Sequence, residues 1–242
     1  WNCATLRRPT RLHECCRLLK QEGMDIWTTQ GTRWPGPPQC FSVQVEEARY
    51  RVYADGHEEG DSYAGVAIVV REDWLHPDWT VKMATHYKGR LMGLRIRGRN
   101  SVDITVVSYY GVPQSAGTIG KRREVLAALE TVIQTTPSRS RLLIMGDFNA
   151  KVGRKACGSA TQGEVQEGVG GGAAVNEQSR VDRTGAEGIG ECLPDREDQP
   201  GTELRKVVAQ YGLRVQNTWD PEGAGGTYTG ARVKWRTGKG KA

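Results

Sequence analysis

Hydrophobic residues recur along this chain at two spacings, and the first of them predicts helices. Residues 10–23 carry four apolar side chains on one helical face, and residues 202–211 carry a similar set. The clearest signal covers residues 121–134, where apolar residues repeat at i, i+1, i+4, i+7 and i+8. We therefore expect three helices.

The second spacing consists of short apolar runs between Gly, Asp and Asn residues, which is typical of strands separated by turns. The expected strands cover residues 24–29, 41–53, 65–70, 80–87, 91–96, 102–110, 142–145 and 213–218. Most of the first half of the chain should therefore be β-sheet. Residues 151–200 are Gly-rich and polar with no sustained period, so we expect a flexible insertion there.

Length and composition favour one globular domain over residues 1–242. The chain is 37% hydrophobic and 26% charged, which is close to ordinary values for folded proteins. No apolar run is long enough for a membrane helix, so no membrane partner is expected. Trp1 stands where a start codon would give Met, and no signal peptide pattern follows it. We expect a fragment of a longer intracellular product, nuclear or cytoplasmic.

Charge and cysteine content refine this interpretation only slightly. A net charge of +6 and a pI near 9.1 fit a polyanionic partner such as nucleic acid, although a basic surface that only aids solubility explains them equally well. The six cysteines form no CxxC pair and have no histidine partners at zinc spacing. Reduced thiols are the simplest expectation.

The segment with the most chemistry is the apolar run 142–145 followed by Gly-Asp-Phe-Asn. Asp147 and Asn149 are two residues apart, so in extended geometry their side chains project to one side. A carboxylate can orient a water molecule, and an amide can donate to a phosphate oxygen without adding negative charge. Gly146 would let the backbone pass close to such a site. The alternative is a strand-ending turn in which both side chains bond local backbone groups.

Residues 146–150 resemble the GDFN signature of the endonuclease/exonuclease/phosphatase superfamily. Five more blocks resemble segments of that family in the family's order: 1–6 (WNCATL), 25–34 (DIWTTQGTRW), 65–69 (GVAIV), 106–113 (VVSYYGVP) and 213–219 (LRVQNTW). The TRW form of the second block is most similar to the endonuclease domain of non-LTR (LINE-type) retrotransposons and to craniofacial development protein 2-like proteins.

This resemblance implies a fold and a reaction. The fold is an α/β sandwich of two mainly antiparallel β-sheets flanked by helices, DNase I-like. It would lack its last strands, since the family's C-terminal IDY and SDH motifs do not occur in this sequence. The reaction is metal-dependent phosphodiester hydrolysis, with DNA nicking as the favoured form. The implied cofactor is Mg²⁺ or Mn²⁺, the implied partner is DNA or RNA, and the parent protein would carry a reverse transcriptase domain.

The resemblance also implies roles for individual residues. Asp147 would orient the attacking water and bind the metal, Asn149 and Tyr110 would bind the phosphate, and Asn2 would support the metal side of the site. The tyrosine block has one extra residue here, so Tyr109 and Tyr110 are both candidates for the family's phosphate-facing tyrosine.

Two departures from the family pattern bear on activity. Gly31 stands where the family has its metal-binding Glu, and Gln30 cannot replace that Glu because it is neutral and points to the other face of a strand. Metal binding should therefore be weak. The Asp-His pair that activates water is also missing. Each histidine fits a surface or helix position better than a relocated base; the four are His13, His57, His76 and His86.

Two alternatives to an active nuclease stay open. One is an inactive remnant that binds nucleic acid without cutting it, as Gly31 and the missing motifs suggest. The other is a phosphodiesterase of the same fold that acts on another ester, such as a phosphoinositide, sphingomyelin or poly(A).

Candidate nucleic-acid contacts combine basic and aromatic side chains, which pair with phosphates and stack on bases. They are Arg33, Trp34, Lys234, Trp235 and Arg236, with core packing as the default interpretation of Trp34. A further set of carboxylates, Glu58, Glu59 and Asp61, is expected to form a solvated hairpin turn rather than a metal cluster.

Overall fold

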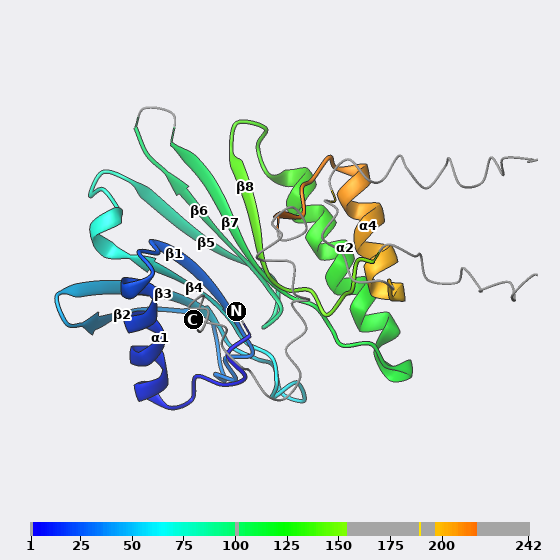
Figure 1. The fold of residues 1–242 in the computed structure, drawn as a ribbon, viewed down its shortest axis with the longest axis horizontal. Coiled ribbons are helices and arrows are strands. Elements are labelled where there is room, and N and C mark those ends of the chain that lie inside the picture. The colour runs from blue at the N-terminus through cyan, green and yellow to red at the C-terminus, as the bar shows by residue number, and fades with distance from the viewer. Residues whose placement is uncertain (1, 100–101, 154–188, 190–196, 217–242) are drawn as a thin grey trace, which may run out of the picture. The chain divides into compact units, whose positions relative to one another are not determined.

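The computed structural model describes residues 2–99, 102–153, 189 and 197–216. It divides into two compact units, Trp1–Asn149 and Ala150–Ala242. The first unit contains two four-stranded sheets, with strand orders β1-β4-β3-β2 and β5-β6-β7-β8 (Figure 1). The expectation of a single domain over the whole chain stays a prediction.

The first sheet is antiparallel throughout. In spatial order its strands are β1 (Ile26–Gln30), β4 (Val66–Arg71), β3 (Ala48–Asp55) and β2 (Gln39–Val45). Helix α1 (Pro9–Gln21) covers the outer face with the four apolar residues that its periodicity marked, Leu12, Cys15, Cys16 and Leu19. These side chains pack against Val43, Tyr50 and Val52 of the sheet.

The second sheet combines antiparallel and parallel pairing. Its strands are β5 (Thr80–Tyr87), β6 (Leu91–Arg97), β7 (Asp103–Tyr110) and β8 (Arg141–Asp147). Strand β8 runs parallel to β7, which requires a crossover connection, and α2 (Ile119–Thr135) provides it. Val125, Leu129 and Val132 of α2 pack on the outer face of this sheet. Two short 3₁₀ helices, η1 (Glu72–Trp74) and η2 (Ala116–Thr118), complete the first unit.

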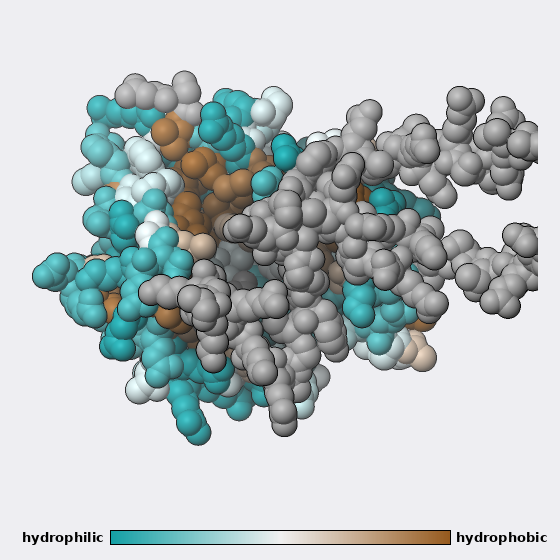
Figure 2. Space-filling view, viewed as in Figure 1, coloured by the Kyte–Doolittle hydropathy of each residue, from teal (hydrophilic) through white to brown (hydrophobic). Residues whose placement is uncertain are grey.

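The main core lies between the two sheets. Val66, Ile68 and Val70 of β4 meet Met92, Leu94, Ile96 and Val106 of the facing sheet, and all seven are fully buried. On the face in view, hydrophilic residues cover α1 and the β2–β3 hairpin, whereas hydrophobic residues gather over strands of the second sheet (Figure 2). The two sheets, with α1 and α2 on their outer faces, confirm the predicted α/β sandwich of two mainly antiparallel sheets flanked by helices.

Several strand boundaries shift by one or two residues from those predicted, and two differences bear on the fold and the site. The run 41–53 is a hairpin of β2 and β3, whose turn consists of Glu46 and Glu47 between the paired residues Val45 and Ala48. Glu46 has a φ of 54° in a turn that no Gly or Asn marks, which is why the sequence pattern missed it. Strand β8 also extends two residues beyond the prediction, so Asp147 is its last residue.

In the second unit, α4 (Gln199–Gln210) begins three residues before the predicted start, and the flexible insertion expected at 151–200 stays a prediction. Asp198 caps this helix by accepting a 2.8 Å hydrogen bond from the backbone of Gly201. Of the strand expected at 213–218, the described part shows one parallel bridge, Ile189 with Val215. Most of the insertion, and the candidates Lys234, Trp235 and Arg236, lie outside the described residues.

The described cysteines are free thiols: Cys3, Cys15 and Cys16 are buried and Cys40 is exposed. Burial raises the pKa of Cys15 and Cys16 to about 12, so these thiols are protonated and unreactive at neutral pH. Cys157 and Cys192 are beyond the part of the chain that the structure describes. Within that same part, every helix is too short or too polar to cross a membrane.

Candidate active site

Three strand ends meet at one edge of the sandwich. Strand β1 ends at Gln30, and the paired strands β7 and β8 end at Tyr110 and Asp147, which are register partners. The first residues of the chain join them, because Asn2 forms a parallel bridge with Gln30. The sequence blocks around Asn2, Gly31, Tyr110 and Asp147 are therefore brought together although they are far apart in sequence.

The Asp147 carboxylate is held by a donor on each oxygen. Asn2 Nδ2 donates to its Oδ2 over 2.8 Å, and the backbone N–H of Asn149 donates to its Oδ1 over 3.0 Å. Asn2 is fixed in turn, since its Oδ1 accepts a 3.0 Å hydrogen bond from the backbone of Ala4. Both side chains are half-buried. The carboxylate is thus oriented by two donors and stays partly accessible to solvent.

Tyr110, rather than Tyr109, lies beside this carboxylate. The ring of Tyr109 is buried under α2 and packs on Phe148 with ring centroids 4.8 Å apart. The phenol of Tyr110 contacts Asn2. Burial raises the pKa of Tyr110; the nearby charge of Arg90 lowers it, the Asp147 carboxylate raises it, and a hydrogen bond with Asn2 lowers it. The neutral phenol is therefore a hydrogen-bond donor at the site.

Asn149 adopts a left-handed backbone conformation, with a φ of 46°, directly after the strand. Its Nδ2 donates to the carbonyl of Gly111 over 2.8 Å, and the Gly111 N–H donates to the Asp147 carbonyl over 2.7 Å. The local turn that the sequence allowed is therefore present, because Asp147 bonds the Asn149 backbone. Asn149 ties the end of β8 to the residue that follows β7.

Gly31 lies tightly against these groups. A Cβ built on Gly31 would lie 2.9 Å from Asn2 Oδ1 and 3.7 Å from the Tyr110 hydroxyl, so a side chain here would enter the site. The backbone of Gly31 has a φ of 67°, which other residues adopt only with strain. Gln30 is fully buried below, and its amide donates to Ser108 Oγ over 3.0 Å. Gly31 therefore brings no carboxylate to this position.

Candidate metal ligands are correspondingly sparse. Among the described residues, no three His, Cys, Asp or Glu side chains lie close enough to hold a metal ion. Asp147 is the one carboxylate that contacts Asn2 in this part of the chain. None of the four histidines, all of which are described, forms a hydrogen bond with Asp147. Over the residues that the structure describes, the site therefore has one oriented carboxylate, that of Asp147, and the neutral polar side chains of Asn2, Tyr110 and Asn149.

The candidate nucleic-acid residues next to Gly31 have different surroundings. The Arg33 guanidinium lies 4.6 Å from the centre of the Tyr63 ring, and Tyr63 is 64% exposed. The Trp34 indole donates to the Leu6 carbonyl over 3.0 Å and packs edge-on against Phe41. Trp34 has the environment of a packing residue, whereas the half-buried Arg33 lies over the exposed ring of Tyr63.

Residues 58–61 form a turn with Glu58 and Glu59 exposed, as the sequence predicted, and the Asp61 N–H donates to the Glu58 carbonyl over 3.2 Å, but Asp61 itself is not solvated. Its side chain is only 16% exposed and forms ion pairs with Arg90 and Lys121. Sequence reasoning missed Arg90 altogether, because a single Arg before a strand carries no pattern that distinguishes a buried ion pair from an exposed charge. Arg90 also contacts the ring of Tyr110, so it lies next to the candidate site.

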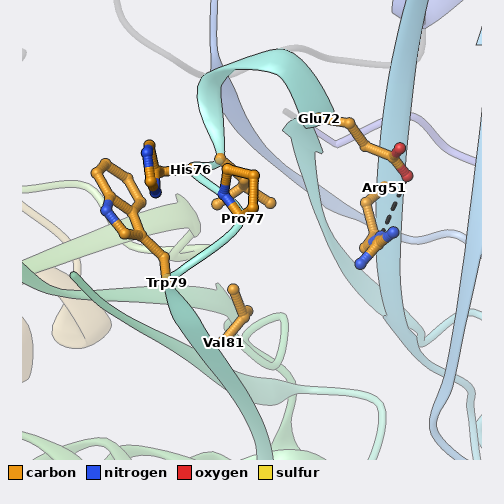
Figure 3. Close-up of a pocket in the computed structure, with 7 residues that line it drawn as sticks. Arg51, Glu72, His76, Pro77, Trp79 and Val81 are labelled. Atoms are coloured by element: carbon orange, nitrogen blue, oxygen red, sulfur yellow. Dashed lines mark hydrogen bonds and ion pairs between the residues drawn. The ribbon is translucent and has the colours of Figure 1, made fainter.

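A pocket lies beyond the end of β4 that is remote from Gln30, Tyr110 and Asp147. It has a volume of about 200 Å³ and lies between the ion pair of Arg51 with Glu72 and the rings of His76 and Trp79 (Figure 3). Its separation from Asp147 excludes it from the candidate active site.

Comparison with known proteins supplies one family match. The sequence matches the model of the Endonuclease/Exonuclease/phosphatase family over residues 1–232. No curated protein sequence matches it. The endonuclease domain of TRAS1, a telomere-specific non-LTR retrotransposon, is 18% identical with a TM-score of 0.47, over 86% of this chain and 68% of that one. The AP endonuclease LMAP from Leishmania major is 14% identical with a TM-score of 0.49, over 63% of this chain and 54% of that one.

Proposed function

This chain belongs to the endonuclease/exonuclease/phosphatase family, and from that membership we propose that it hydrolyses phosphodiester bonds of nucleic acid, with DNA nicking as its reaction. The observation that carries the proposal is the Asp147 carboxylate, oriented by Asn2 beside the Tyr110 phenol. An oriented carboxylate next to neutral donors suits attack by water on a phosphate, because the donors add no negative charge where charge develops.

In this proposal Asp147 orients the attacking water and accepts its proton, while Asn2 keeps the carboxylate in place. Tyr110 donates its phenol hydrogen to a phosphate oxygen. Asn149 contributes to phosphate binding from the turn after β8, and its bond to Gly111 fixes the position of its amide. The general-base contribution alone is worth about 10²- to 10⁴-fold in rate.

Members of this family generally depend on a divalent metal ion. The residues present here do not fit a resident ion, since one carboxylate reaches the site among the described residues and Gly31 supplies none. We keep Mg²⁺ or Mn²⁺ in the proposal only as a weakly bound ion whose remaining ligands would come from water and substrate phosphate.

The proposed partner is DNA, with RNA as a related substrate, and the proposed setting is a retrotransposon protein that also carries a reverse transcriptase. The exposed ring of Tyr63 beside the half-buried Arg33 supports nucleic-acid contact near the site, because an Arg can pair with phosphate while an aromatic ring stacks on a base. Lys234, Trp235 and Arg236 would add basic and aromatic groups from the end of the chain.

The test is conversion of supercoiled plasmid to the open circle with Mg²⁺, with Mn²⁺ and with a chelator. We expect slow nicking that needs a high metal concentration and that Asp147→Ala abolishes. Asp78→Asn removes an exposed carboxylate remote from the strand ends and is the matched control. Nicking that survives Asp147→Ala would remove the assignment.

A second candidate is a nucleic-acid-binding protein that does not cut, and Gly31 is the observation that favours it. Filter binding of labelled DNA over a salt series separates the two candidates when run beside the nicking assay. Binding that weakens steeply with salt, without turnover at any metal concentration, supports the second candidate.

A further inference from the structure

We propose that Arg90, held by the carboxylate of Asp61, is a positioning residue that sets the orientation of Tyr110 and Asn149 at the active site. Its effect on turnover rests on the proposed function, whereas its effect on the two side chains does not. Arg90 directly precedes β6 and is only 5% exposed, so its charge is buried among the elements that form the site.

The first contact of Arg90 is with Tyr110. The guanidinium carbon lies 4.5 Å from the centre of the Tyr110 ring, a stacking distance at which a cation is attracted to the aromatic face. The backbone reinforces this pairing, because the Tyr110 N–H donates to the Arg90 carbonyl over 2.7 Å. The ring is thus fixed on one face by a planar group while its hydroxyl contacts Asn2.

The second contact links Arg90 to Asn149 through one carbonyl. The oxygen of Gly111 accepts from Arg90 Nη1 over 3.3 Å and from Asn149 Nδ2 over 2.8 Å. Arg90 and Asn149 therefore share an acceptor, and the guanidinium helps to fix the carbonyl that holds the Asn149 amide. Two of the proposed phosphate-binding side chains depend on the same buried Arg.

Asp61 makes this burial possible. It accepts hydrogen bonds from Arg90 Nε over 3.0 Å and from Arg90 Nη2 over 2.8 Å, and Lys121 Nζ donates to it over 2.8 Å. Burial opposes ionisation of Asp61, but Lys121 and Arg90 outweigh it and lower the pKa of this carboxyl. A buried charge without a partner costs several kcal/mol, so Arg90 needs the ionised carboxylate.

The geometry requires an arginine rather than any cation. One guanidinium bonds a carboxylate through two nitrogens, reaches a carbonyl with a third N–H and stacks on a ring, because it is planar with donors on its rim. A lysine ammonium in the same place could pair with Asp61 but could not also stack on Tyr110. Arg90→Lys therefore keeps the positive charge beside Asp61 and removes the stacking on Tyr110.

The test uses the full chain with an isotope label in its tyrosine rings, and NMR spectra in which the Tyr110 ring signal is identified by its loss in Tyr110→Phe. The variants are Arg90→Gln and Arg90→Lys. The matched control is Arg95→Gln, since Arg95 lies in β6 and also pairs with a carboxylate through two nitrogens, that of Asp103. Plasmid nicking is measured on the same samples.

We expect the Tyr110 signal to move in both Arg90 variants and to stay in place in Arg95→Gln. Nicking should fall about 10- to 100-fold in Arg90→Gln, with a smaller loss in Arg90→Lys, because small misplacements of binding groups have effects of this size. If Arg90→Gln does not fold, Arg90→Lys carries the test, as it keeps the charge that Asp61 requires.

A Tyr110 signal that stays unchanged in folded Arg90→Lys, or that moves equally in Arg95→Gln, would overturn the positioning role. Failure of the proposed function gives a different result: the unchanged chain does not nick, while the Tyr110 signal still responds to Arg90 and not to Arg95.

Discussion

The side-chain amide of Asn2 donates to the Asp147 carboxylate over 2.8 Å, across 145 positions of the sequence. This bond connects the start of the chain with the last residue of β8. The backbone supports it nearby, because the N–H of Cys3 donates to Gln30 and that of Leu6 donates to Thr32. The orientation of the proposed catalytic carboxylate therefore depends on how the first residues pack beside β1.

Replacing Gly31 tests the missing metal carboxylate. Gly31→Glu should strengthen Mn²⁺ binding, measured by calorimetry, because it adds a second carboxylate beside Asn2 and Tyr110. It should also lower the free energy of unfolding by about 1–3 kcal/mol, since the φ of residue 31 is positive. Gly31→Ala is the control, with the same strain and no carboxylate. Equal Mn²⁺ affinity in the two variants would contradict the account of this position.

Removing one hydroxyl tests the role of Tyr110. Tyr110→Phe keeps the ring on Arg90 but loses the donor beside Asn2, so nicking should fall about 10-fold with a stability loss of about 1 kcal/mol. Tyr109→Phe changes a ring buried under α2 and should alter nicking less than about twofold. A larger nicking loss in Tyr109→Phe than in Tyr110→Phe would reverse the assignment.

The close approach of β8 to β7 depends on Gly146. A Cβ built there would overlap the carbonyl oxygen of Tyr109, so Gly146→Ala must push the two strands apart next to Asp147. We expect a loss of about 1–3 kcal/mol in urea unfolding. Gly117, in η2, has nothing within 4 Å of a Cβ, and Gly117→Ala should change stability by less than about 0.5 kcal/mol. Similar losses in both variants would show that the contact with Tyr109 is unimportant.

Acid sensitivity should depend on Asp103. A hydrogen bond from Arg95 holds the pKa of this carboxyl well below its ordinary value, against the effect of burial and with help from Ser140 and Arg139. A lowered folded-state pKa gives stability that is complete above the unfolded value of about 4 and is lost as pH falls toward the folded value. Asp103→Asn should therefore be less stable than the unchanged chain at about pH 7, and the gap should narrow at about pH 3. A gap that widens in acid would contradict this linkage.

The sequence predicted most elements of the first unit because their periodicity is simple. The apolar face of α1 and the strand pattern of β5 to β7 match the structure nearly residue by residue. The hairpin of β2 and β3 was missed because its turn uses Glu46 in a left-handed conformation, which side-chain type does not reveal. The sequence pattern predicts an element well where burial dictates the residue types. It predicts poorly where a single backbone angle, such as the φ of Glu46, determines where a strand ends.

For the candidate site, the sequence identified the residues but not their connections. The Gly-Asp-Phe-Asn segment located Asp147, and the family blocks pointed to Asn2, Gly31 and Tyr110. Arg90 and its pairing with Asp61 were missed, because a buried ion pair forms between segments 29 residues apart and neither residue type is unusual at the surface. Tertiary pairing of this kind has no signature in a single sequence.

In the proposed function Asn2 and Asp147 act as one unit, and the decisive experiment is a double-mutant cycle on plasmid nicking. Rates are measured for the unchanged chain, Asn2→Ala, Asp147→Asn and the double variant. We predict that each single change lowers the rate and that the double variant is no slower than Asp147→Asn, since groups that act together show non-additive losses. Losses that simply multiply, or nicking that persists in Asp147→Asn, would contradict the account.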